Sequence, residues 1–255
     1  MSADFSIITE LPGNRAHAEQ LAMIHTRYKW AGDKAAGRDV LEAACGPGRG
    51  LGYLAARARS VVGGDITPAL VEAANGHYRG APKALVMDAQ QMTFVDASFD
   101  MVLLFEALYY MPKPEAFLAE ARRVLRPGGI LLISCPNPEW ADFNPSPFSV
   151  RYFTADELRA MLDGAGFQVV VRAGFSAASS GALVRTSSAL RRVAVSLGVV
   201  PKSMSGKALL KRIFYGSLFE LGPEIDATVA AGGLFSVGPG PVTDYKMLYA
   251  DATRA

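Results

Sequence analysis

The 255-residue sequence has few of the residues that mark disulfide-rich, zinc-binding or polyanion-binding proteins. Its two cysteines, Cys45 and Cys135, stand far apart and form no Cys-x-x-Cys pair, which argues against a disulfide framework and a zinc cluster. Lys and Arg number 26 and Asp and Glu 24, so the net charge of +2 does not suggest a nucleic-acid partner. We expect no metal site and a reducing, cytoplasmic setting.

Long hydrophobic runs are also lacking. The longest are short, such as 101–105, whereas about 18 apolar residues are needed to span a bilayer. The first 14 residues carry Asp4 and Glu10 before any Arg and have no apolar stretch typical of a signal peptide. We therefore expect no transmembrane segment. Hydrophobic residues make up 50% of the chain and charged residues 20%, which is typical of a soluble globular protein with a substantial core.

Short apolar runs alternate with helical patterns along most of the chain, which predicts an α/β protein with a doubly wound, mostly parallel sheet. A helix over 16–30 precedes the sheet, Thr67-Pro68 and Pro114 open crossover helices, and Thr154 with Glu157 matches a capping box. About seven strands are expected, at 40–44, 60–64, 84–87, 101–105, 129–134, 168–173 and 245–250.

The pattern divides the chain into four parts. We expect a helical cover over 1–36, a core over 37–175, a helical lid or substrate insertion over 176–241 and a last core strand over 242–255. The insertion shows weak helical patterns at 183–197 and 208–221. Between Gln168 and Phe219 there is no Asp or Glu but there are eight basic residues: Arg172, Arg185, Arg191, Arg192, Lys202, Lys207, Lys211 and Arg212. They form either a solvated face or a surface that recognises an anionic or carrier-linked acceptor.

A glycine-rich turn follows the first core strand, at Gly46-Pro47-Gly48. Glycines there let the backbone approach a ligand, and the next helix offers unpaired N–H groups. The dinucleotide fingerprint fails, because Leu51 or Tyr53 stands where its third glycine belongs. Asp65 and Asp88 follow the next two strands, at the edge where open α/β sheets bind ligands. Each aspartate alone could be a helix cap or surface charge, but together they favour a nucleoside site.

Five motifs in order resemble those of the class I S-adenosylmethionine-dependent methyltransferases. They cover residues 38–173 together with the last strand, and they are Glu42–Gly48, Gly64–Pro68, Asp88–Ala89, Ser98–Val102 and Leu125–Gly129. The resemblance implies a Rossmann-like sheet with an antiparallel last strand, methyl transfer as the activity, S-adenosyl-L-methionine as the cofactor and S-adenosyl-L-homocysteine as its product.

The resemblance also implies which residues bind the cofactor. In chain order they are Tyr28, Glu42, Ala44, Gly46, Gly48, Asp65, Ile66, Asp88, Ala89 and Phe105. Glu42 and the loop glycines would hold the methionine part. Asp65 would hold the ribose, and Asp88 with Ala89 the adenine. Ala44 departs from the family pattern, because many members have glycine there.

The protein's part in methyl transfer is alignment, with a base added when the acceptor must lose a proton. His25, on the expected covering helix, and Glu106, directly after the fourth strand, are the candidate bases. The alternatives are a packing histidine and a hydrogen-bonded pocket wall. Tyr109 and Tyr110, which stand where similar members often have Glu-His, are expected to face the substrate.

Two features indicate the acceptor. The segments 25–28 and 146–154 resemble members that methylate sugars, glycolipids or related natural products. The Asn/Asp-Pro-Pro-aromatic element that commonly follows the fourth strand of nucleobase and amide methyltransferases is replaced by Phe105–Leu108. We therefore expect a small-molecule hydroxyl acceptor. A nitrogen or carbon acceptor, and a non-catalytic cofactor-binding partner module, are the alternatives.

Overall fold

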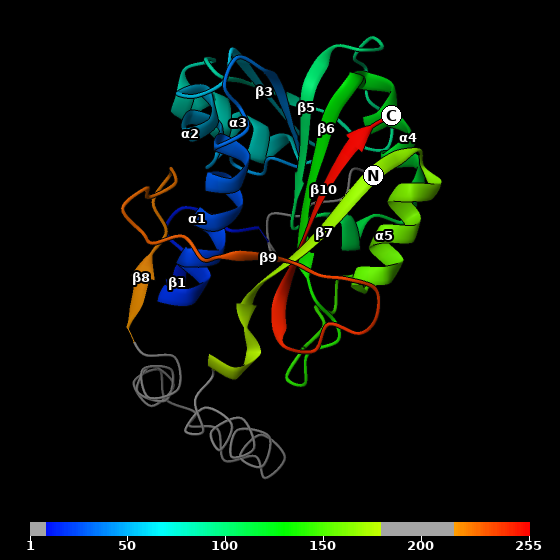
Figure 1. The fold of residues 1–255 in the computed structure, drawn as a ribbon. Helices are drawn as coiled ribbons and strands as arrows, with labels where there is room; N and C mark the ends of the chain where they lie inside the picture. Colours follow the sequence, from blue (N-terminus) through cyan, green and yellow to red (C-terminus); the bar gives the residue numbers. More distant parts are fainter. Residues whose placement is uncertain (1–8, 180–216) are drawn as a thin grey trace.

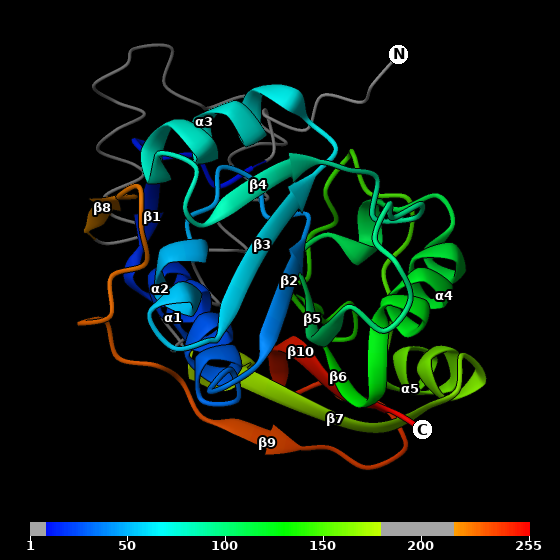
Figure 2. The same cartoon turned by 90° about the horizontal axis from the view of Figure 1, so that it is seen from above.

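A central sheet with helices on both faces organises the protein (Figures 1 and 2). The computed structural model describes residues 9–179 and 217–255. The strand order is β4-β3-β2-β5-β6-β10-β7-β9. The strands are β2 (Asp39–Ala43), β3 (Ser60–Asp65), β4 (Lys83–Val86), β5 (Phe99–Phe105), β6 (Leu125–Pro136), β7 (Phe167–Ser176), β9 (Leu234–Ser236) and β10 (Tyr245–Arg254).

The pairing confirms the predicted doubly wound sheet with an antiparallel last strand. β2 pairs in parallel with β3 on one side and with β5 on the other. The pairs β3–β4 and β5–β6 are also parallel. β10 runs antiparallel between β6 and β7 and pairs with both. The carboxyl ends of β2, β3, β4 and β5 therefore meet at one edge of the sheet.

Helices cover the two faces of the sheet separately (Figure 2). On one face lie α1 (Ala18–Gly32), α2 (Leu51–Ala55) and α3 (Pro68–Tyr78), and on the other α4 (Pro114–Val124) and α5 (Ala155–Gly164). Side chains alternate between the two cores: on β5, Met101 and Leu103 pack toward α1–α3, whereas Val102 and Leu104 pack toward α4 and α5. Because both faces are covered, the strand is a continuous apolar run.

Helix starts follow the predicted signals. Pro68 and Pro114 stand in the first turns of α3 and α4, where a missing N–H leaves no intrahelical bond unmade. At α5 the Thr154 hydroxyl accepts from the Glu157 N–H at 3.2 Å, and the Glu157 carboxylate accepts from the Thr154 N–H at 2.9 Å. The capping box is therefore present.

The predicted helical lid over 176–241 lies mostly outside the described residues and stays a prediction. Its described part, 176–179 and 217–241, contains a 3-10 turn, η2 (Ala177–Ser179), and two short strands, with no α-helix. β8 (Leu218–Glu220) pairs antiparallel with β1 (Arg15–His17), where the sequence predicted helix for both segments, because pairing between distant segments overrides a weak local pattern. β9 adds an eighth strand beside β7.

Of the eight basic residues between Gln168 and Phe219, only Arg172 lies among the described residues. Arg172 is on β7, where its Nη1 donates to the Ser236 hydroxyl at 3.1 Å. Residues 180–216, which are outside the described ranges, contain the helical pattern at 183–197 and most of the pattern at 208–221. They also contain the other seven basic residues, which are Arg185, Arg191, Arg192, Lys202, Lys207, Lys211 and Arg212.

Three further observations concern the described ranges. Their helices are all too short or too polar to cross a membrane. Over the same residues, His, Cys, Asp and Glu side chains nowhere gather in threes that could hold a metal ion. Cys45 and Cys135 are buried free thiols.

Candidate active site at the carboxyl edge of the sheet

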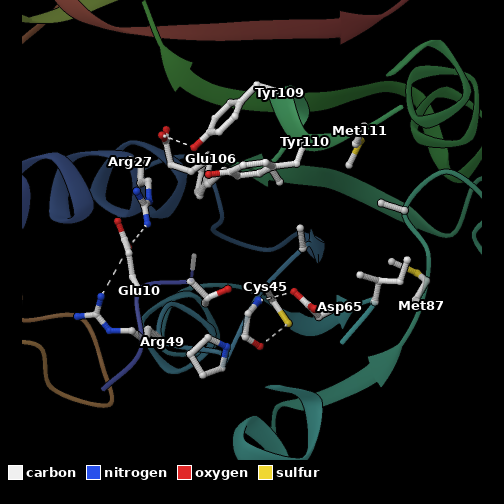
Figure 3. A pocket seen from close by; sticks show the side chains of 18 of the residues that line it. Glu10, Arg27, Cys45, Arg49, Asp65, Met87, Glu106, Tyr109, Tyr110 and Met111 are labelled. Atoms are coloured by element: carbon white, nitrogen blue, oxygen red, sulfur yellow. Dashed lines mark hydrogen bonds and ion pairs between the residues drawn. The ribbon is translucent and has the colours of Figure 1, made fainter. Parts of the chain in front are cut away.

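A cavity of about 620 Å³ opens where β2, β3, β4 and β5 end (Figure 3). Its walls come from the turn after each of these strands, from α1, from η1 (Leu108–Tyr110) and from the segment around Glu10. This volume lies within the range of about 300–1,000 Å³ typical of small-molecule sites. The place is the one predicted from the strand-end motifs.

The Asp65 carboxylate joins the ends of β2 and β3. Oδ2 accepts from the Gly46 N–H and Oδ1 from the Thr67 N–H, both at 2.9 Å. Burial raises the pKa of Asp65, although these two donors act in the opposite direction. Gly46 has φ +56°, and a Cβ there would lie 3.0 Å from the Thr9 methyl carbon. The turn therefore needs glycine both for its backbone conformation and for space.

Two residues without a glycine's freedom adopt left-handed backbone conformations beside the cavity. Ala44, after β2, has φ 56°, and Glu106, after β5, has φ 54°. Such a conformation costs an L-residue about 1–2 kcal/mol and concentrates at functional sites. The conformation at Ala44 gives a physical reason why glycine suits this position in similar proteins.

The Glu42 carboxyl lies behind Tyr28, not in the cavity wall. The Tyr28 hydroxyl donates to Glu42 Oε1 at 2.5 Å. Glu42 Oε2 is buried and has no hydrogen-bond partner among the described residues. Burial raises the pKa of Glu42 to about 7, against the lowering effects of Tyr28 and Arg27. Glu42 is thus a buried acid with one unused oxygen directly behind the cavity.

Glu106 presents a second carboxyl, which is part-buried and lines the cavity. Its Oε1 accepts from the Ser134 hydroxyl at 2.9 Å and its Oε2 from the Tyr109 hydroxyl at 3.4 Å. Burial raises the pKa of Glu106, while Arg27 and the two hydroxyls lower it. The Tyr109 ring stacks on Tyr152, with centroids 4.9 Å apart, so the hydroxyl is held in place.

Most of the predicted site residues line this one cavity. From the cofactor set these are Tyr28, Ala44, Gly46, Asp65, Ile66, Asp88, Ala89 and Phe105, and from the acceptor set Glu106, Tyr109 and Tyr110. Gly48 is outside the wall: a Cβ there would lie 2.9 Å from the Ala74 methyl, so this glycine allows α3 to pack closely. The roles of all these residues stay predictions.

His25 does not join the other candidate bases. The residue is buried in α1 and is absent from the cavity wall. Its Nδ1 contacts the Val229 carbonyl oxygen, and its ring packs edge-on against Tyr53 with centroids 6.0 Å apart. The structure therefore does not support His25 as a candidate base, because both contacts hold its ring away from the cavity wall.

Sequence reasoning gave no role to three charged residues of the wall: Glu10, Arg27 and Arg49. Arg27 and Arg49 are only 7% and 6% exposed. The signal was visible, since Arg27 adjoins Tyr28 and Arg49 lies in the glycine-rich turn. What the sequence could not indicate is that Glu10, from the N-terminal segment, lies between them (Figure 3).

These residues fit the cofactor that the motifs imply. The glycine turn forms a cradle that a Cβ would narrow, and Asp65 and Asp88 supply acceptors for hydroxyl and amine groups. Arg27 and Arg49, which line the same cavity, each keep a buried donor without a hydrogen-bond partner among the described residues. A ligand with an adenosine end and a charged amino-acid end needs this combination of acceptors and charges.

Comparison with known proteins points to one family. The sequence model described as "Methyltransferase domain" matches residues 41–133. A probable S-adenosylmethionine-dependent methyltransferase of Mycolicibacterium smegmatis is 37% identical over 150 residues, which are 56% of this chain and 56% of that protein. An O-methyltransferase of Aspergillus nomiae is 32% identical over 148 residues, 52% of this chain and 66% of the relative. The chain thus spans about half the length of the first relative.

Solved structures share the fold. A crystal structure of an S-adenosylmethionine-dependent methyltransferase from Thermotoga maritima superposes with a TM-score of 0.58 and covers 93% of this chain and 94% of its own. Its sequence identity is 18%, so the likeness concerns architecture.

Proposed function

We propose that this chain, which carries a class I S-adenosylmethionine-dependent methyltransferase domain, transfers a methyl group to a hydroxyl oxygen of a small molecule. The observation that carries the oxygen assignment is Glu106, a part-buried carboxyl of raised pKa in the wall of the cavity. Bound S-adenosylmethionine supplies a methyl group that its sulfonium centre makes electrophilic. A hydroxyl acceptor must also lose a proton, and a carboxylate of raised pKa is suited to take it.

The surroundings of Glu106 support this role. Ser134 and Tyr109 each donate to one carboxylate oxygen, which fixes the group's orientation while leaving further lone pairs on both oxygens. Phe105, Tyr109 and Tyr110 provide an aromatic wall that excludes water from an acceptor beside Glu106. Glu106 thus accepts the hydroxyl proton, and the wall aligns the acceptor oxygen.

Relatives also support an oxygen acceptor, since one of the similar proteins is named an O-methyltransferase. A nitrogen or carbon acceptor is the second candidate, and for it Glu106 would serve as a hydrogen-bonded wall. The third candidate is a partner module that binds the cofactor without catalysis. If the protein is such a module, we expect it to bind the cofactor and to transfer no methyl group to any acceptor.

The test is a screen of hydroxyl-bearing natural products, sugars and lipids with methyl-labelled S-adenosylmethionine, followed by kinetics of Glu106→Gln. The wild-type rate should rise with pH through the pKa of Glu106, because only the ionised carboxyl accepts a proton. Glu106→Gln should lower kcat at least about a hundredfold and abolish this rise. Glu115→Gln, an exposed glutamate on α4, is the matched control. An unchanged pH profile in Glu106→Gln would contradict the assignment of the base.

A further inference from the structure

Two buried arginines in the cavity wall have no part in the proton transfer. Arg27 comes from α1 and Arg49 from the turn before α2, and both are more than nine-tenths buried. A buried guanidinium is costly unless an anion and hydrogen-bond acceptors compensate it. The pKa of Arg49 is lowered, because burial outweighs the attraction of Glu10. For Arg49 the compensation that this chain provides is therefore incomplete, whereas the pKa of Arg27 is raised, since burial is outweighed by the attraction of Glu10 and its other neighbours.

Both guanidinium groups turn toward one carboxylate, that of Glu10 (Figure 3). Arg27 Nη2 donates to Glu10 Oε2 at 2.6 Å, whereas Arg49 Nη1 lies 3.7 Å from the same oxygen, which is beyond hydrogen-bond distance. Arg27 Nε and Arg49 Nη1 are buried with no hydrogen-bond partner among the described residues. One carboxylate thus leaves two buried donors unsatisfied, and both belong to side chains of the cavity wall.

The two arginine side chains are held in place, whereas the Glu10 carboxylate is the more exposed partner of the three. Arg27 stands in the 15-residue helix α1, and Arg49 is anchored by its Nε, which donates to the Gly222 carbonyl at 3.0 Å. The Glu10 side chain is 29% exposed, against 9% and 7% for the two arginine side chains. Beyond its ion pairs, the segment is joined to Leu221 by two backbone hydrogen bonds, from the Gly13 N–H to the Leu221 carbonyl at 2.9 Å and from the Leu221 N–H to the Asn14 carbonyl at 2.8 Å.

The two other carboxyls near Arg27, those of Glu42 and Glu106, do not supply the negative charge that a ligand carboxylate would bring. Glu42 and Glu106 both have raised pKa values because they are buried, so they are less ionised at neutral pH than exposed glutamates. Glu42 also binds the Tyr28 hydroxyl, and Glu106 binds Ser134. The pair of arginines therefore presents net positive charge to one part of the cavity, on the other side from Asp65 and Met87 in Figure 3.

We propose that Arg27 and Arg49 form a subsite for the carboxylate of a bound ligand, and that Glu10 is an internal occupant which this carboxylate displaces. The inference builds on the proposed function, since the ligand class is an adenosine thioether with an amino-acid tail. Glu10 then competes with the ligand, and the segment that carries Glu10 moves away from the two arginines when the ligand binds.

Calorimetric titration with two probes tests this subsite. S-adenosylhomocysteine carries the amino-acid carboxylate, whereas 5′-methylthioadenosine has the same adenosine thioether without it. A charge-assisted hydrogen bond corresponds to an affinity change of about tenfold or more. We expect Glu10→Gln to strengthen S-adenosylhomocysteine binding about tenfold, and Arg27→Gln or Arg49→Gln to weaken it about tenfold. Binding of 5′-methylthioadenosine should change less than about twofold in all three.

Glu72→Gln, on the exposed face of α3, is the matched control for Glu10→Gln and should leave both affinities unchanged. If an arginine variant fails to fold, Glu10→Gln still tests competition, because its side chain is part-exposed. An equal ratio of the two affinities in the wild type and all variants would overturn the subsite and leave the proposed function standing. Weaker S-adenosylhomocysteine binding by Glu10→Gln would overturn the role of Glu10 as an occupant. Failure of the wild type to bind either probe would overturn the proposed function as well.

Discussion

We expect Glu42→Gln to remove a pH-dependent loss of stability from the ligand-free protein. The pKa of Glu42 is about 7 in the folded chain, compared with an ordinary value of 4.5. Below the ordinary value the carboxyl is protonated in both the folded and the unfolded chain. As the pH rises between the two values, the unfolded chain releases this proton first, which favours unfolding. The stabilising difference is therefore lost as the pH rises through about 7.

The size of the effect follows from the shift. A difference of about 2.5 pH units corresponds to about 3 kcal/mol of unfolding free energy at 1.36 kcal/mol per unit. The Glu42 side chain is 1% exposed, so solvent screens little of this energy. A glutamine can still accept the Tyr28 hydroxyl hydrogen bond through its amide oxygen but carries no titrating group. The substitution thus separates the ionisation of Glu42 from its contact with Tyr28.

Urea unfolding from pH 4 to pH 8 measures this difference. The free energy of unfolding of the wild type should fall relative to Glu42→Gln by about 3 kcal/mol over this range. The exposed Glu72→Gln variant should follow the wild type. Parallel curves for the wild type and Glu42→Gln, within about 0.5 kcal/mol, would refute the reasoning, because they would show that burial does not perturb this carboxyl.

Two further substitutions test the glycine turn and its partner. Asp65→Asn replaces the carboxylate that accepts from the Gly46 and Thr67 N–H groups with a neutral amide. Calorimetry should therefore show S-adenosylhomocysteine binding weakened about tenfold or more. An unchanged affinity would contradict the role of Asp65. Gly50→Ala places a Cβ inside the Tyr28 ring and should lower the unfolding free energy in urea by about 1–3 kcal/mol. Gly76→Ala in α3, where a Cβ meets nothing within 4 Å, is the control and should raise the unfolding free energy by about 0.5–1 kcal/mol. Equal changes of the unfolding free energy in Gly50→Ala and Gly76→Ala would show that the Tyr28 ring is free to move.

The sequence predicted the parts of the fold that local patterns determine. Buried parallel strands are continuous apolar runs, and the polar turns that follow them mark the edge at which ligands bind. Asp65 and Asp88 were therefore located at the cavity before any contact was known. The Thr154–Glu157 capping box was equally visible, since both hydrogen bonds lie within four residues.

What the sequence could not predict depends on pairs of distant segments. β8 has a weak helical pattern, yet it pairs with β1, about 200 residues earlier in the chain. Glu10 contacts Arg27 and Arg49 only because the N-terminal segment passes the mouth of the cavity. The orientation of His25 is set by Val229, which precedes the last strands. None of these contacts between distant segments produces a hydrophobic periodicity or a motif in the local sequence.

The position of β10 in the sheet has a consequence for the order in which the strands can pair. β6 and β7 do not pair with each other, and β10, from residue 245 onward, supplies the ladder to both. Strands β2 to β6 find all their other partners within residues 39–136, so they can pair with one another before β10 has been synthesised. β7 and α5 cannot join them until residues 245–254 emerge, and until then two unpaired strand edges are exposed.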